Sequence, residues 1–174
     1  ILLYISHVFL NSFTLQIIRA KGGDSSHMGL SMALAALSEL PTMLLFTRML
    51  RKKSSSFYMK LTGFFFLLKA VGSWLAPNVT VYYLFQLTQV GAWALIAIAS
   101  VYYVNAIMEP QDAVKGQAYF TSAYTLANVF GALLGGRLID TLGITAMLLL
   151  GTVFATLGTA VNLVFAEKTV DKGI

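Results

Sequence analysis

Cysteine is absent from this chain, and histidine, proline and charged residues are scarce. Without cysteine there can be no disulfide, no thiolate metal ligand and no cysteine nucleophile. The two histidines, His7 and His27, stand far apart in the sequence and give little support for a metal site. No Ser/His or paired-aspartate arrangement falls in segments that would face one another, so we expect neither an enzyme nor a bound cofactor.

Charge is scarce because most of the chain is apolar. Of the 174 residues, 11% are charged and 57% are hydrophobic, and the mean hydropathy is +0.76. A soluble domain carries about 25% charged residues, so this composition indicates an all-α integral membrane protein that crosses the lipid bilayer several times. The net charge of +5 does not indicate nucleic-acid binding, because the basic residues cluster beside apolar stretches, where they set topology.

Six apolar stretches, separated by short polar ones, are predicted to be transmembrane helices, because open sheets cannot span lipid. They cover about residues 1–18, 28–47, 61–76, 81–104, 118–139 and 144–166 and form one six-span domain. Pro41 is expected to kink the second helix. Because the chain opens at Ile1, already in apolar sequence and without an initiator methionine, we expect a preceding half to be missing.

Lysine and arginine are unequally shared between the two sides of these spans, and the richer side is expected to face the cytoplasm. That rule places the 48–60 loop and the C-terminus inside a cell, with a bacterial inner membrane as the expected location. The richer side carries Arg48, Arg51, Lys52, Lys53, Lys60, Lys115, Lys168 and Lys172, and the poorer side Arg19, Lys21 and Arg137.

Two ionisable residues interrupt the apolar stretches, Glu39 in the second and Lys69 in the third. A charge at the bilayer centre costs about 2.5–3.5 kcal/mol on insertion scales, and such residues usually pair, line a wet cavity and serve function. We expect Glu39 to accept substrate and to carry a proton, held near Lys69. The structural alternatives are a buried, protonated Glu39 and a Lys69 whose ammonium snorkels to the interface.

Other polar side chains lie at similar depths in neighbouring spans, and helical spacing groups them on shared faces. Hydroxyl, amide and indole groups suit an uncharged polar ligand held by hydrogen bonds and ring stacking. The alternative is that these groups only join helices to one another. The predicted substrate-binding residues are Glu39, Asn11, Gln86, Gln89, Trp93, Asn128, Tyr124 and His7, with Glu39 and Lys69 as the ion pair of proton coupling.

Six spans, a basic loop after the second, and the run 131–136 (GALLGG) ahead of Arg137 and Asp140 resemble the C-terminal half of a major facilitator superfamily transporter. Residues 69–76 (KAVGSWLA) and the position of Glu39 are most similar to the oligosaccharide–proton symporters, the lactose permease-like group. Gln86 and Gln89 depart from that group, because titratable residues occupy their places there. The resemblance implies half of a twelve-helix fold, in which spans one, two, four and five line the cavity.

Together these features predict half of a secondary active transporter that moves a small polar solute, such as a sugar or oligosaccharide, by proton symport through alternating access. One rival is a drug-efflux antiporter of the same superfamily. Another is a non-transporting receptor or assembly subunit, in which Glu39 and Lys69 form a structural ion pair. The predicted partners are the solute, the bilayer and the missing N-terminal half, with the proton as coupling ion and without metal, other cofactor or nucleic acid.

Overall fold

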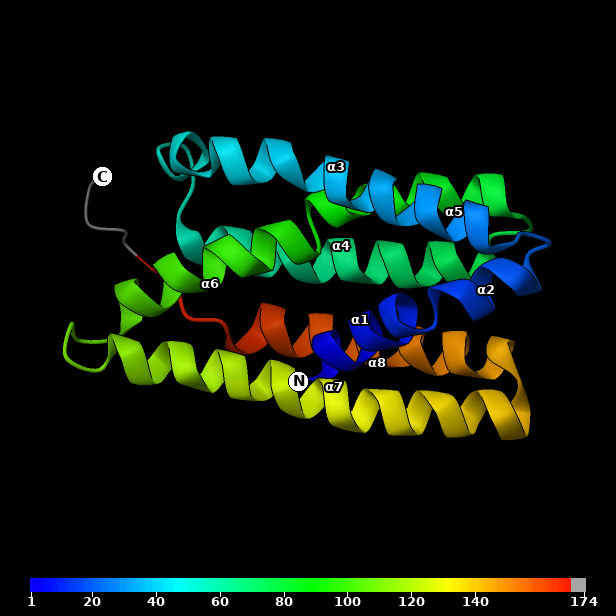
Figure 1. The fold of residues 1–174 in the computed structure, drawn as a ribbon. Coiled ribbons are helices and arrows are strands. Elements are labelled where there is room, and N and C mark those ends of the chain that lie inside the picture. Colours follow the sequence, from blue (N-terminus) through cyan, green and yellow to red (C-terminus); the bar gives the residue numbers. More distant parts are fainter. Residues whose placement is uncertain (170–174) are drawn as a thin grey trace.

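The computed structural model describes residues 1–169, and within that range it is helical and contains no strand, as the composition predicts. In Figure 1 the helices lie side by side along a common axis, and the loops gather at two ends. Lys172, which enters the charge count above, lies outside the described residues. The elements are α1 (Leu2–Ser12), α2 (Thr14–Ala20), α3 (Ser25–Leu50), α4 (Ser55–Leu75), α5 (Val79–Gln86), the 3-10 turn η1 (Leu87–Val90), α6 (Trp93–Ile107), α7 (Ala113–Leu142) and α8 (Ile144–Phe165).

Within the described range, three helical segments are long and apolar enough to cross a membrane: α3, the α5–α6 segment Val79–Ile107, and α8. Their outer faces expose large apolar side chains, including Leu44 on α3 and Val164 on α8. Soluble proteins avoid apolar surface on this scale, so these helices indicate a membrane protein. The arrangement of all six predicted stretches as spans stays a prediction.

Where the sequence predicts one continuous first helix, the structure has two, separated at Phe13 with φ −109° and ψ 22°. The hydroxyl of Thr14 donates to the carbonyls of Leu10 and Asn11, both at 2.9 Å. Side-chain hydroxyls that bond to the preceding turn bend helices, which accounts for the break. The fourth stretch is also interrupted, by η1 and by Ala92 with φ −87° and ψ −88°.

The second stretch, in contrast, is one helix that runs through Pro41. It begins at Ser25, before the predicted start, because Asp24 caps it. The Asp24 carboxylate accepts hydrogen bonds from the backbone N–H groups of Ser26 at 2.9 Å and His27 at 3.2 Å. These bonds satisfy amide donors that a helix otherwise leaves unpaired.

Helix α4 packs on one face against α1, α5, α6 and α8, and exposes Phe64 and Leu75 on its outer face. Its buried face repeats every three to four residues and includes Thr62, Phe66, Lys69 and Ser73. The hydroxyl of Thr159 on α8 donates to the carbonyl of Gly63 at 2.8 Å and fixes the two helices together. Lys69 therefore points into protein rather than into lipid.

Small residues on α7 and α8 allow α1 to approach closely. A Cβ atom at Gly131 would lie 2.9 Å from Val8, and one at Gly158 would lie 2.9 Å from Leu3. Both distances are shorter than carbon–carbon contact, so each glycine admits a neighbouring side chain, as in other membrane bundles. Helix α1 is thereby held between α7 and α8, and it also packs against α4.

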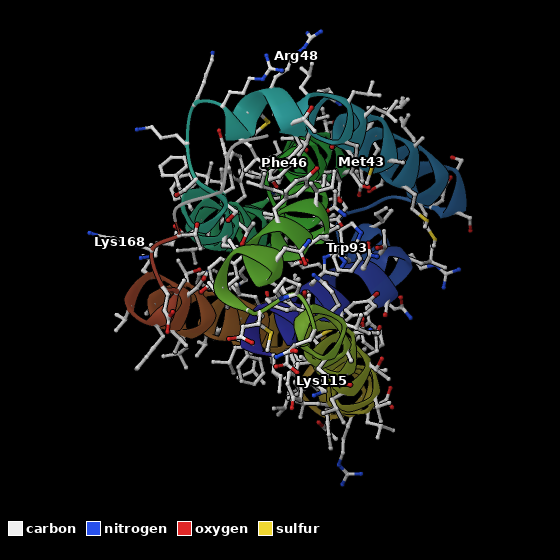
Figure 2. The ribbon with its side chains drawn as sticks, turned by 90° about the vertical axis from the view of Figure 1, so that its left-hand side faces the viewer. Met43, Phe46, Arg48, Trp93, Lys115 and Lys168 are labelled. Atoms are coloured by element: carbon white, nitrogen blue, oxygen red, sulfur yellow. The ribbon has the colours of Figure 1, made fainter. Side chains whose placement is uncertain are left out.

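The α3–α4 and α6–α7 loops lie at one end of the bundle, and the α2–α3 loop and the α7–α8 turn lie at the other (Figure 1). Figure 2 looks along the bundle from the end that holds the loop between α3 and α4. Arg48 and Lys168 lie at the rim of this end, whereas Trp93 lies near the middle of the bundle.

Candidate functional site

A cavity of about 260 Å³ lies among α1, α3, η1, α6 and α7. Within residues 1–169 its lining comes from the first, second, fourth and fifth predicted stretches, and neither α4 nor α8 contributes to it. Met32, Ala35 and Ala36 supply its small and apolar wall. The structure thus brings together most of the residues singled out in the sequence, namely His7, Asn11, Glu39, Gln89, Trp93 and Tyr124.

Glu39 supplies the carboxylate of this cavity. It lies midway along α3 and is half-buried. Its Oε1 accepts a hydrogen bond from Nε2 of Gln89 at 3.0 Å. No hydrogen bond to Oε2 is found in the part of the chain that the structure describes, so this oxygen is available to a ligand or a proton.

Lys69 lies behind the cavity, with 1% of its surface exposed. Its ammonium donates a hydrogen bond to Oε1 of Gln89. Between residues 1 and 169, no ion pair joins Lys69 directly to Glu39. The two charges are joined instead through a chain of three groups, ammonium, amide and carboxylate, and their role in proton coupling stays a prediction. A snorkelling lysine is excluded by its burial.

Gln89 lies at the point where the α-helix of the fourth stretch is interrupted, and from there its side chain contacts both charged groups. Its turn, η1, separates α5 from α6 and leaves backbone carbonyls outside a regular helix. One of these, the carbonyl of Val90, accepts a hydrogen bond from the Thr42 hydroxyl at 2.7 Å. Irregular backbone at membrane depth needs such partners or water. Helix α3 therefore supplies both the Glu39 carboxylate and, from Thr42, the hydrogen bond that stabilises the interrupted backbone at η1.

Aromatic side chains form another wall of the cavity. The His7 imidazole stacks on the Trp93 indole, with ring centroids 4.6 Å apart and an interplanar angle of 3°. Tyr124 lies 5.0 Å from Trp93, centroid to centroid, and Tyr4, which lines the adjoining cavities rather than this one, lies 5.4 Å from Tyr124. Such a wall offers a flat apolar face beside hydroxyl and ring nitrogen groups, which suits a ligand ring.

Two predicted site residues lie elsewhere. Gln86 is buried with Tyr82 in a separate polar group, and its Nε2 has no hydrogen-bond partner among residues 1–169. The fourth stretch is interrupted at η1 and again at Ala92, so Gln86, Gln89 and Trp93 do not share one continuous helix. Asn128 donates to the carbonyl of Tyr124 at 2.9 Å, so its amide serves its own helix.

Two contributing residues were not predicted. Thr42 stands three positions after Glu39, on the same face of α3, and this spacing together with Pro41 was a usable signal. Tyr4 stands one turn before His7 and likewise shares its face. The residue type alone did not predict either contribution, because threonine and tyrosine also occur in membrane helices as packing residues.

Two further cavities adjoin the bundle core. One of about 200 Å³ shares Trp93 and Tyr124 with the polar cavity and continues along α6 and α7 past Ser100 and Gln117. Another, of about 450 Å³, is larger but almost wholly apolar, between α1, α4, α6, α7 and α8. Its chemistry does not suit a polar ligand, so the candidate site is the smaller cavity at Glu39.

The α2–α3 loop, at the other end of the bundle, carries its own electrostatics. Hydrogen bonds from Ser26 and His27 hold the pKa of Asp24 well below its ordinary value. Burial lowers the pKa of Lys21, whose ammonium donates to the carbonyl of Ala76 at 2.6 Å. The part of the chain described here contains no group of three His, Cys, Asp or Glu residues that could hold a metal ion.

Residues 1–150 match the MFS_1 like family, which is most of the chain. The chain belongs to the MFS_1 like family. A search of curated proteins found no match. Membership in this major facilitator superfamily-like family, together with the three apolar helices, indicates a membrane transporter, and transporters of this kind are not normally enzymes. The match gives the family and not the oligosaccharide–proton symporter subgroup.

Proposed function

We propose that this MFS_1 like family member is the C-terminal six-helix half of a secondary transporter that moves a small polar solute by proton symport. A preceding six-helix half completes the cavity, and alternating access exposes it to each side in turn. The end that carries Arg48 faces the cytoplasm of an inner membrane, as the excess of lysine and arginine there implies.

The observation that supports this proposal is the position of the Glu39 carboxylate, which opens on the cavity while the opposite charge is buried behind Gln89. A hydroxyl-rich solute can donate to this carboxylate and stack a ring face on Trp93. A sugar or oligosaccharide meets both requirements. Glu39 also carries the coupling proton, because a closed, dry cavity penalises its charge and an open, wet cavity favours it.

The test is uptake by the full-length parent protein in proteoliposomes, with labelled lactose and sucrose as probes and an inward proton gradient. Wild type accumulates a probe above its external concentration, and Glu39→Gln does not, because glutamine keeps the hydrogen-bonding shape but cannot titrate. Glu109→Gln makes the same chemical change in an exposed loop and is expected to behave as wild type. Near-normal uphill uptake by Glu39→Gln would refute the role given to this residue.

A drug-efflux antiporter is the second candidate, and the aromatic wall of His7, Trp93 and Tyr124 favours it. A carboxylate beside aromatic faces also suits a lipophilic cation. The same vesicles separate the two candidates. Proton-driven extrusion of ethidium, without accumulation of either sugar, would select the antiporter.

A further inference from the structure

The carboxamide of Gln89 is engaged at both ends, although Gln89 lines the cavity. Its Oε1 accepts from the Lys69 ammonium, and its Nε2 donates to the Glu39 carboxylate at 3.0 Å. An amide has one accepting end and one donating end, so two opposite charges fix its orientation. Because Gln89 is 4% exposed, water cannot readily replace either partner.

Gln89 also stands at the least regular part of the bundle core. It belongs to η1, and Gly91 and Ala92 follow before α6 begins at Trp93. A 3-10 turn within a longer helix often marks a hinge. A movement of the Gln89 amide together with its turn would therefore shift the nearby Trp93 indole, which forms part of the cavity wall.

We propose that Gln89 is a positioning residue that links occupation of Glu39 to rearrangement of the helix break. A proton from cavity water adds to Oε2 of Glu39, or a ligand hydroxyl donates to the carboxylate, and no other covalent bond changes. Protonation removes the charge assistance of the Nε2 bond, which accounts for about half of its strength. A ligand hydroxyl leaves the charge in place and weakens the bond less, by competing for the carboxylate. The amide, still held at Oε1 by Lys69, is then free to move with its turn.

The groups that face Glu39 allow this exchange. His7 and Tyr124 line the cavity from α1 and α7, and Lys69 reaches Glu39 from α4 through the amide. A direct contact between ammonium and carboxylate would attract more strongly, because Coulomb attraction falls with distance. The interposed amide therefore keeps the two charges linked but separable. This inference rests on the proposed function, which makes Glu39 the group that is occupied in each cycle.

The test uses the full-length protein, with Trp74→Phe so that Trp93 is the reporting tryptophan of this chain. Infrared difference spectra follow the protonation of Glu39, and the carboxyl band is assigned to this residue because it disappears in Glu39→Gln. The fluorescence of Trp93 follows rearrangement of the helix break between α5 and α6. Acidification should change both signals with one midpoint. In Gln89→Leu the infrared change remains and the Trp93 response falls about tenfold, the factor that one charge-assisted hydrogen bond carries.

Two controls keep this test selective. Thr88→Val alters the same turn without touching either charge, because its hydroxyl bonds only to the carbonyl of Phe85 within the described chain, and its response should match wild type. If the Trp93 fluorescence still changed in Glu39→Gln, the signal would come from titration of the stacked His7 rather than of Glu39, and the proposal would be overturned. An undiminished response in Gln89→Leu would overturn it as well.

A second variant guards against misfolding. Gln89→Glu retains the bond to Lys69 but cannot donate to Glu39 when ionised, so it should also lose the Trp93 response. The spectroscopic measurements need no substrate, so their outcome can be told apart from that of the uptake assay. Failure of wild type to move any probe would refute symport alone, whereas a wild-type level of sugar accumulation by Gln89→Leu would refute the role of Gln89.

Discussion

Replacing Gly91 by alanine tests how closely the helix break at η1 packs against Phe65 of α4. A Cβ atom at Gly91 would lie 2.2 Å from Cδ2 and 2.3 Å from Cγ of Phe65, far inside carbon–carbon contact. The backbone of Gly91, at φ −107° and ψ −11°, accepts an alanine without strain. Because Cγ is the base of the ring, rotating the ring about its own axis cannot relieve the clash. Phe65 must adopt another rotamer, or η1 must move away from α4.

Overpacking of this kind costs about 1–3 kcal/mol. Alanine recovers roughly 0.4–1 kcal/mol by reducing the freedom of the unfolded chain. The expected net effect is a loss of about 1–2 kcal/mol in the free energy of unfolding. Gly29→Ala is the matched control, since a Cβ atom there would have no neighbour within 4 Å, and it should be neutral or slightly stabilising.

Denaturant unfolding of the purified protein in detergent micelles measures both changes. Combining Gly91→Ala with Phe65→Leu should restore part of the loss, because the smaller side chain vacates the space that Cβ needs. A double-mutant cycle is expected to give a coupling of at least about 0.5 kcal/mol between the two positions. A Gly91→Ala protein as stable as wild type, or a coupling of zero, would contradict the close approach of Phe65.

Three further predictions follow. Thr42→Val leaves the partly buried carbonyl of Val90 without its side-chain partner and should lower the free energy of unfolding by about 1–3 kcal/mol, whereas Thr42→Ser keeps the hydroxyl and should cost less in the same denaturation assay. Combining Lys69→Met with Glu39→Leu should preserve folding, measured by circular dichroism, but abolish proton-driven sugar uptake; retained activity would favour a structural role for both charges. Asp24→Asn should keep the helix cap while reducing the acid sensitivity of thermal unfolding. The folded pKa of Asp24 is lowered by its hydrogen bonds, so its contribution is present above the unfolded value of about 3.9 and is lost as the pH falls below it; equal acid sensitivity of Asp24→Asn and wild type would contradict this.

The helices themselves follow from local sequence, as α3 illustrates. Apolar residues run through its length, Asp24 caps its start, and Arg48 lies in its last turn. These are local signals that need no knowledge of neighbours. The boundary between α1 and α2 was less accessible, because the Thr14 hydroxyl could equally have bonded along a continuous helix. The break at η1 was not predicted, since the support for it comes from Thr42, a residue distant in the chain.

Composition and the spacing of Glu39, Lys69 and the polar residues determined the class of protein, the helical segments and much of the cavity lining, because burial of polar groups in an apolar chain is costly wherever the chain folds. Only the tertiary structure decided that Gln89 separates the two charges, and that Gln86 and Asn128 turn elsewhere. The physical reason is that depth along a helix is set by a fixed rise per residue. The direction in which a side chain points depends on breaks in the helix and on packing between segments distant in the chain.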